Sequence, residues 1–216
     1  MKPESKQSKT TTRTANASVA KSARKQQVSE RLTKTAARQL RERGPEGISV
    51  KSVMASEGMT VGGFYAHFAS KEALVVAALE EAFAETHRRA PDKPLDPDYL
   101  RGFLRRYLSM AHRDQPGVSC PIASLASDMP RESDAVRAVY QQGLQSLIAA
   151  LAKALPVGSE QEAQRLAMSM AATAIGALQL ARAVPDEAFS KRILDECLDT
   201  LLKLIDRSID RSADAP

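Results

Sequence analysis

The sequence contains no tryptophan, and aromatic residues make up only 4% of its 216 positions. A hydrophobic core must therefore be built from Ala, Leu, Val, Ile and Met, which are more typical of helical proteins than of β-sandwiches or β-barrels. An all-β fold is disfavoured for this reason. We expect an all-α protein of about nine helices, with an N-terminal three-helix bundle and a larger C-terminal helical domain.

Long apolar runs and a cysteine framework are also missing. The longest stretch without a charged residue, 166–181, has 16 residues, whereas a helix that spans a bilayer needs about 20. The N-terminus lacks the apolar segment of a secretory signal. Only Cys120 and Cys197 are present, and two distant cysteines form neither a disulfide framework nor a metal-ligand pattern. We expect a cytoplasmic protein without a membrane span, metal or cofactor.

Positive charge is concentrated at one end of the chain. The net charge is +5, but residues 1–71 carry +9 and the remaining residues carry −4. A basic N-terminal third is suited to a polyanion such as DNA. Residues 1–21 contain Lys, Ser, Thr and Ala with almost no large apolar residue, which predicts a disordered basic arm. This arm is either a nucleic-acid contact or a solvated tail.

The next segment has the pattern of several short helices. Apolar residues recur at every fourth position within 22–43, which predicts a buried helical stripe, and Gly44 follows as a helix end. Ser49 is placed to cap a second helix, which Gly58 stops after about two turns. Thr60 is placed to cap a third. Two short helices separated by a tight turn are typical of the helix-turn-helix, whose second helix lies in the DNA major groove.

The most specific pattern lies at residues 59–74, which read Met-Thr-Val-Gly-Gly-Phe-Tyr-Ala-His-Phe-Ala-Ser-Lys-Glu-Ala-Leu. This segment closely resembles the DNA-binding domain of TetR/AcrR-type repressors, in which an aromatic-Tyr-x-His-Phe run precedes Ser, Lys and Glu. The resemblance extends over about residues 25–80. It implies a homodimeric transcriptional repressor, with a helix-turn-helix domain at 22–71 and an effector-binding and dimerisation domain at 72–216.

The candidate DNA-binding residues lie in this motif. Gly62 and Gly63 lack a Cβ atom, so the backbone can approach base edges or phosphates closely; the alternative is that both relieve packing. Tyr65 and His67 carry groups that reach phosphate oxygens, and Lys71 stands at a helix N-terminus. A packing role for His67 and a solvated Lys71 are the alternatives. The predicted DNA-contacting residues are Ser49, Thr60, Val61, Gly62, Gly63, Tyr65, His67 and Lys71.

Two long helices are predicted at the C-terminal end, at about 159–183 and 185–209. The resemblance implies that this pair meets its twin in a four-helix dimer interface; burial within one monomer is the alternative. Because a dimer places two recognition helices about 34 Å apart, it predicts a palindromic operator on double-stranded DNA.

The middle helices concentrate aromatic and sulfur-containing side chains. The resemblance implies a pocket for a small-molecule effector here, to which we assign Phe103, Tyr107, Cys120 and Tyr140, although a core role fits each residue as well. Cys120 precedes Pro121 at a predicted helix N-terminus, where the helix dipole favours a thiolate. Cys120 is therefore either an electrophile-sensing thiol or a buried packing residue.

Two other functions are open to a chain of this composition. A non-specific or architectural DNA-binding protein, held on DNA by the basic arm, is the main alternative. An enzyme is not expected, because His67, His87 and His112 lie far apart in the sequence and no nucleophile, metal-ligand or phosphate-loop motif is present.

Overall fold

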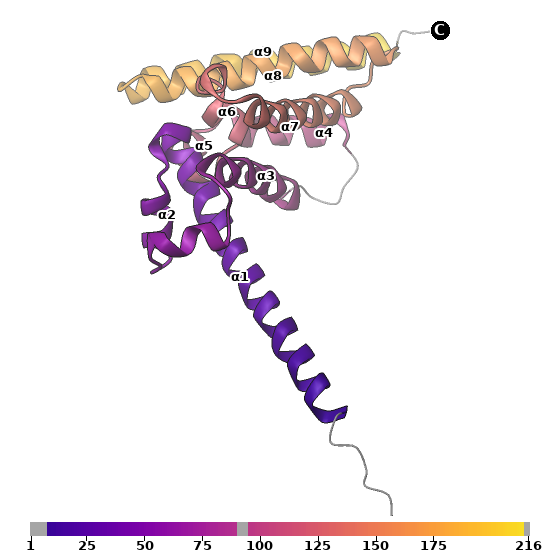
Figure 1. Cartoon of the computed structure of the whole chain (residues 1–216). Coiled ribbons are helices and arrows are strands. Elements are labelled where there is room, and N and C mark those ends of the chain that lie inside the picture. Colours follow the sequence, from indigo (N-terminus) through magenta and orange to yellow (C-terminus); the bar gives the residue numbers. More distant parts are fainter. Residues whose placement is uncertain (1–7, 90–94, 214–216) are drawn as a thin grey trace, which may run out of the picture.

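The computed structural model describes residues 8–89 and 95–213, and every regular element in these ranges is a helix (Figure 1). The elements are α1 (Ser8–Gly47), α2 (Val50–Ser56), η1 (Val61–Ala66), α3 (Lys71–Arg89), α4 (Pro97–Tyr107), α5 (Met110–Arg113), η2 (Pro116–Val118), α6 (Pro121–Leu125), η3 (Met129–Arg131), α7 (Asp134–Lys153), α8 (Glu160–Ala183) and α9 (Glu187–Ala213), where η marks a 3₁₀-helix. The all-α prediction is confirmed. Figure 1 shows α8 and α9 side by side along one edge, with α1 running away from the other helices.

Helix α1 is longer than the sequence pattern predicts. It begins at Ser8 rather than near residue 22, so the structure differs from the predicted disordered arm over residues 8–21. Residues 1–7 of that arm lie outside the described ranges. Ala, Lys, Arg and Gln have high helix propensity, and extending an existing helix avoids the cost of nucleation. At the other end, Gly44 adopts φ 71°, a conformation that glycine tolerates, and this ends the regular part as predicted.

The first hydrophobic core joins α1, α2, η1 and α3. Its fully buried side chains include Leu32, Ala36, Leu40, Val53, Met54, Phe64, Leu74 and Leu79. Ser49 caps α2, since its hydroxyl accepts the backbone N–H of Ser52 at 3.0 Å and the Ser52 hydroxyl accepts the N–H of Ser49. Gly58 at φ 67° forms the turn after α2. The predicted bounds of this short helix are therefore confirmed.

The second core joins α4, α6, α7, α8 and α9. Its most buried side chains include Leu100, Leu104, Met170, Leu178, Leu194, Leu201 and Ile205. The predicted cap of α4 is confirmed, because Asp96 accepts the N–H of Tyr99 at 2.7 Å and Pro97 follows at the first helical position. Ser159 caps α8 in the same way by accepting the N–H of Glu162.

Helix α8 is the one described helix that is long and apolar enough to cross a membrane by length and composition. Its best 18-residue window has a mean hydropathy of 1.2, and 39% of that window is buried inside the chain. The buried side is a stripe of small residues and Met170 against α9 and α7. The exposed side carries Met168 and Leu180.

Candidate nucleic-acid interface and effector site

The reading motif consists of α2, the turn at Gly58 and η1. The second element is a 3₁₀-helix rather than the predicted α-helix, because Gly62 and Gly63 weaken α-helical propensity. Thr60 stands at its N-cap position as predicted, but its side chain makes no capping hydrogen bond. Phe64 anchors η1, since its ring is 1% exposed and stacks on Phe68 at 5.6 Å between centroids.

The outer face of η1 is apolar and aromatic. Val61 is 47% exposed and Tyr65 is 74% exposed, although large apolar side chains are usually covered. Thr60, Ser49 and Lys71 are also exposed, so the structure brings most of the predicted DNA-contacting residues to the surface around η1. These groups are free to meet a partner without any change in the core.

The two glycines of η1 are not explained by packing in the isolated chain. A Cβ atom at Gly62 would meet nothing within 4 Å, and one at Gly63 would make only ordinary contact with Met54, at 3.6 Å, and with Met59. Neither glycine has a positive φ angle, unlike Gly58. The packing alternative is therefore unsupported at Gly62.

His67 is held by helix α1. Its Nδ1 atom lies 2.8 Å from the Ser29 hydroxyl, which also lies 3.1 Å from the carbonyl oxygen of Lys25. This contact fixes the ring against α1, and whether Nδ1 accepts from or donates to the hydroxyl depends on the histidine tautomer. The ring is thereby oriented, with Nε2 left for an external contact.

Helix α1 also clamps the end of α2 through residues that the sequence pattern did not reveal. Glu57 accepts hydrogen bonds from Thr35 at 2.5 Å and from Arg31 at 2.6 Å. The Thr35 hydrogen bond, together with Arg31, lowers the pKa of the Glu57 carboxyl against the opposing effect of burial. Gln39 is 4% exposed and bonds to Ser52 and Ser56 of α2. The spacing of Arg31, Thr35 and Gln39, four residues apart, is the signal that could have indicated this polar stripe.

The four predicted effector residues lie in one neighbourhood of the second domain. The rings of Phe103 and Tyr107 are 5.5 Å apart. Burial, and then the electrostatic effect of the Cys120 side chain, raises the pKa of Tyr107, and the same two causes raise that of Tyr140 to about 12. Tyr140 donates to the carbonyl of Ile122 at 3.0 Å. The Tyr107 hydroxyl is buried without a hydrogen bond of normal geometry, which is costly unless something else meets it.

Cys120 is half-buried, and its backbone is fixed by His112. The Nδ1 atom of His112 lies 2.6 Å from the carbonyl oxygen of Tyr107, so Nδ1 carries a proton. Nε2 then accepts the N–H of Cys120 at 3.3 Å and the hydroxyl of Ser119 at 2.7 Å. Burial is the main cause that lowers the pKa of His112, which keeps the ring neutral.

Arg182 of α8 completes this cluster and was not identified from the sequence. Its guanidinium donates to Ser119 at 2.8 Å, to the carbonyl of His112 at 2.9 Å and to the carbonyl of Arg113 at 3.1 Å. Burial lowers the pKa of Arg182. Arg182 is the first charged residue after the long uncharged run of α8, and a charge at the end of such a run was the available signal.

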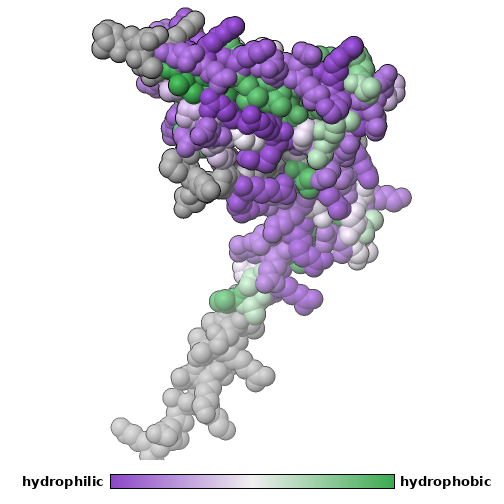
Figure 2. Space-filling view, turned by 180° about the vertical axis from the view of Figure 1, so that it is seen from behind, coloured by the Kyte–Doolittle hydropathy of each residue, from purple (hydrophilic) through white to green (hydrophobic). Residues whose placement is uncertain are grey.

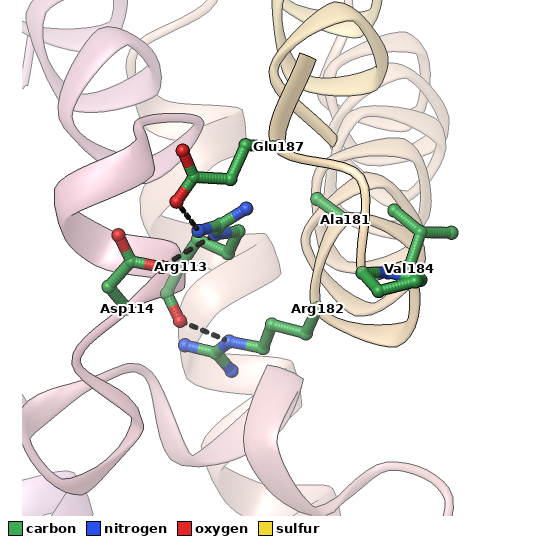
Figure 3. Close-up of a pocket in the computed structure, with 7 residues that line it drawn as sticks. Arg113, Asp114, Ala181, Arg182, Val184 and Glu187 are labelled. Atoms are coloured by element: carbon green, nitrogen blue, oxygen red, sulfur yellow. Dashed lines mark hydrogen bonds and ion pairs between the residues drawn. The ribbon is translucent and has the colours of Figure 1, made fainter. Parts of the chain in front are cut away.

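A cavity of about 250 Å³ opens beside the cluster, next to the turn between α8 and α9 (Figure 3). Its lining residues are Arg113, Asp114, Ala181, Arg182, Val184, Pro185 and Glu187. None of the four predicted effector residues lines this cavity. Figure 3 shows Arg182 reaching from α8 to the backbone of Arg113, so the cavity and the Cys120 cluster share one side chain.

The helical fold and the exposed motif define a helix-turn-helix DNA-binding protein. Residues 32–78 match the profile of bacterial regulatory proteins of the tetR family. Residues 98–194 match the C-terminal domain of LmrA/YxaF-like transcriptional regulators. The chain therefore belongs to the TetR family of transcriptional regulators.

Individual relatives agree with this assignment. The HTH-type transcriptional repressor NemR of Escherichia coli (strain K12) is 28% identical over 124 residues, which are 55% of this chain and 62% of NemR, so less than two thirds of that relative is covered. A TetR transcriptional regulator from Chloroflexus aurantiacus J-10-fl superimposes with a TM-score of 0.70 at 25% identity, over 86% of this chain and 98% of its own. The reduced form of E. coli NemR has the same fold, with a TM-score of 0.67 at 23% identity over 81% and 95% of the two chains.

Proposed function

We propose that this protein is a cytoplasmic transcriptional repressor that binds a palindromic operator as a homodimer and is released by a small-molecule effector. Residues 22–71 read the DNA, and residues 72–216 hold the effector and the partner subunit. The observation that carries the proposal is the exposed face of η1, where Val61 and Tyr65 flank a glycine that packing does not require. The residues proposed to contact DNA are Ser49, Thr60, Val61, Gly62, Gly63, Tyr65, His67 and Lys71.

Base recognition at this surface has a specific chemistry. The described side chains of η1 include no arginine or asparagine that could form a bidentate bond to a base. Val61 and Thr60 are suited to contact thymine methyl groups, and Gly62 lets the backbone come close. Tyr65, His67 and Lys71 fix the motif on phosphates. Sequence preference then comes partly from DNA shape.

The dimer is proposed to form through α8 and α9. Figure 2 shows a hydrophobic band over these helices, and Met168, Leu180 and Phe189 are 51%, 60% and 43% exposed. A helix with the hydropathy of α8 that is only 39% buried in its best window needs a partner surface in water. Light scattering at micromolar concentration tests this step: a dimer is expected, and a monomer contradicts it.

The effector is proposed to bind at Phe103, Tyr107, Cys120 and Tyr140. The Tyr107 hydroxyl, which has no hydrogen bond of normal geometry, supplies a polar group for a ligand, and the Cys120 thiol beside it is suited to an electrophile. In the simplest reaction, the thiolate adds to an activated C=C bond: a C–S bond forms, the π bond opens, and the adjacent carbon takes up a proton. Alkylation of purified protein should therefore weaken operator binding, and Cys120→Ser should abolish that response.

Selection of sheared genomic DNA by the purified protein, at near-physiological salt, tests the whole proposal. Enrichment of a few sites that share a palindrome is expected. Uniform retention would instead favour a non-specific DNA-binding protein held by its basic N-terminal region, with a steep dependence on salt. The family assignment does not favour that alternative.

A further inference from the structure

One short segment lies between two groups of helices: α1, α2, η1 and α3, which share the first core and which we call the DNA-reading half, and α4 to α9, which we call the body. We call Pro116–Cys120 the strap; it contains η2 and leads into α6. Arg41 of α1 donates from Nε to the carbonyl of Gly117 at 2.7 Å, and Arg89 of α3 donates to the carbonyl of Val118 at 2.8 Å. The two helices of the DNA-reading half thus hold the front of the strap.

Arg41 is an unusual residue for this role because it is buried. It is 4% exposed, and its guanidinium pairs with Glu85 of α3 at 2.7 Å. Glu85 is also 3.9 Å from Arg89. Removing an arginine from water is expensive, and its pairing with one carboxylate and one carbonyl only partly offsets that cost. Arg41 therefore joins α1, α3 and the strap at one buried point.

The back of the strap belongs to the proposed effector cluster. Ser119 is 2% exposed and bonds to His112 and Arg182, while the N–H of Cys120 bonds to His112. Adjacent residues of one backbone are consequently held by the body on one side and by the DNA-reading half on the other.

The strap also has little room to move independently of α1. A Cβ atom at Gly117 would lie 2.4 Å from Oε1 of Glu42 and 3.1 Å from Cγ of Arg38, both on α1. The Glu42 oxygen is the end of a flexible side chain and can move aside, whereas Cγ of Arg38 lies near the α1 backbone, so the strap is seated against α1 chiefly at Arg38. Helix α1 in turn holds the reading motif through the Ser29 bond to His67 and the Arg31 bond to Glu57.

We infer that Arg41 is a positioning residue that transmits the state of the Cys120 site to the DNA-reading motif. The inference rests on the proposed operator release through Cys120. An adduct at Cys120 disturbs the bonds of Ser119 and Cys120 to His112, and the strap shifts. Because Arg41 and Arg89 bond to the strap, α1 and α3 move with it, and the position of η1 relative to the DNA changes.

The test uses a Cys197→Ser background, in which Cys120 is the only thiol of the chain. Operator affinity is measured by fluorescence anisotropy before and after complete N-ethylmaleimide modification. Modification should weaken binding by about tenfold or more in the reference protein. Arg41→Met and Arg89→Ala should bind the operator nearly as well as the reference before modification, and should reduce the weakening to about threefold or less.

Arg88→Ala is the matched control, because Arg88 is 57% exposed, similar to Arg89 at 55%, but pairs with Glu81 rather than with the strap. Modification should weaken operator binding by Arg88→Ala as much as it does in the reference protein. The inference would be overturned if modification weakened operator binding by Arg41→Met and Arg89→Ala as much as it does in the reference protein. If Arg41→Met does not fold, the result with Arg89→Ala decides.

If the reference itself does not respond, Cys120 is not the sensor, and the strap is tested without an effector. Arg182→Met is introduced both into the protein that keeps Arg41 and into the Arg41→Met protein. A loss of operator affinity on Arg182→Met that disappears in the Arg41→Met protein supports transmission through the strap. Equal effects in both backgrounds, or no effect in either, overturn it.

Discussion

The two regions to which we assign DNA binding and effector binding are built in opposite ways. The DNA-reading region exposes Tyr65 by 74% on a short helix that one buried ring anchors, whereas the effector region buries Tyr107 to 6% among half-buried polar groups. DNA is a large polyanion that cannot enter a protein, so the residues that read it must face outward. A small effector is recognised by being enclosed in the fold, so the site proposed for it is largely buried and carries a few polar groups.

The comparison predicts that fold and DNA binding can be separated at neighbouring positions of η1. Phe64→Ala removes a ring that is 1% exposed, and it should lower the free energy of unfolding by about 3 to 5 kcal/mol. Urea denaturation measures this loss. A loss below about 1 kcal/mol would mean that Phe64 does not anchor the motif.

Tyr65→Phe should leave stability unchanged, because the side chain is largely exposed. Operator affinity should fall by about tenfold, which corresponds to one lost phosphate hydrogen bond. Tyr99→Phe, in the body, is the control for an effect of the phenol elsewhere. Unaltered operator affinity in Tyr65→Phe would remove this hydroxyl from the interface.

Substitutions at Gly62 and Gly58 should also separate DNA binding from stability. The Cβ atom that Gly62→Ala adds would meet nothing within 4 Å, so the fold should tolerate this variant while its operator affinity drops. Gly58→Ala forces a Cβ atom into φ 67° and should cost about 1 kcal/mol of stability. Denaturation and operator titration of both variants separate the two roles; a destabilised Gly62→Ala with normal affinity would contradict the assignment.

In the body, two buried phenols should respond in opposite directions. Tyr107→Phe removes a buried hydroxyl that has no hydrogen bond of normal geometry and should leave stability unchanged or raise it. Tyr140→Phe removes the hydrogen bond to Ile122 and should lower stability by about 1 kcal/mol. A destabilised Tyr107→Phe would show that its hydroxyl is already satisfied in the folded protein.

The smallest expected effect is a pH dependence of the body. Burial lowers the pKa of His112 in the folded state, so the unfolded chain binds this proton more tightly. The stability that His112 contributes is present above the unfolded pKa of about 6.5 and is lost as the pH falls below it. Denaturation at pH 7.5 and 5.5 should show a loss that His112→Asn reduces. An equal loss in the variant would assign the dependence to other groups.

The sequence predicted the DNA-reading region better than the body because its signals are local. Ser49, Gly58 and the run after Met59 specify caps, a turn and a family motif within a few residues. The 3₁₀ geometry of η1 was not predicted, because the two glycines that weaken α-helical propensity there were interpreted only as a means of close backbone approach. The start of α1 was also missed, because composition alone does not distinguish a disordered basic segment from a continued helix.

The body cluster depends on residues that are distant in the chain. Arg182 meets Ser119 across 63 positions, and Arg41 meets Gly117 across 76. No local spacing encodes such pairs, so the sequence yielded Tyr107 and Cys120 by composition and family resemblance but neither arginine. Buried charges of this kind become visible only when the helices are assembled.

Competition between operator and scrambled DNA is the most direct test of sequence-specific binding. A palindrome recovered from genomic DNA is titrated against a scrambled duplex of equal length at near-physiological salt. The account predicts that the protein binds the palindrome at least about a thousandfold more tightly, and that Tyr65→Phe weakens this binding. Equal affinity for both duplexes would contradict a sequence-specific repressor.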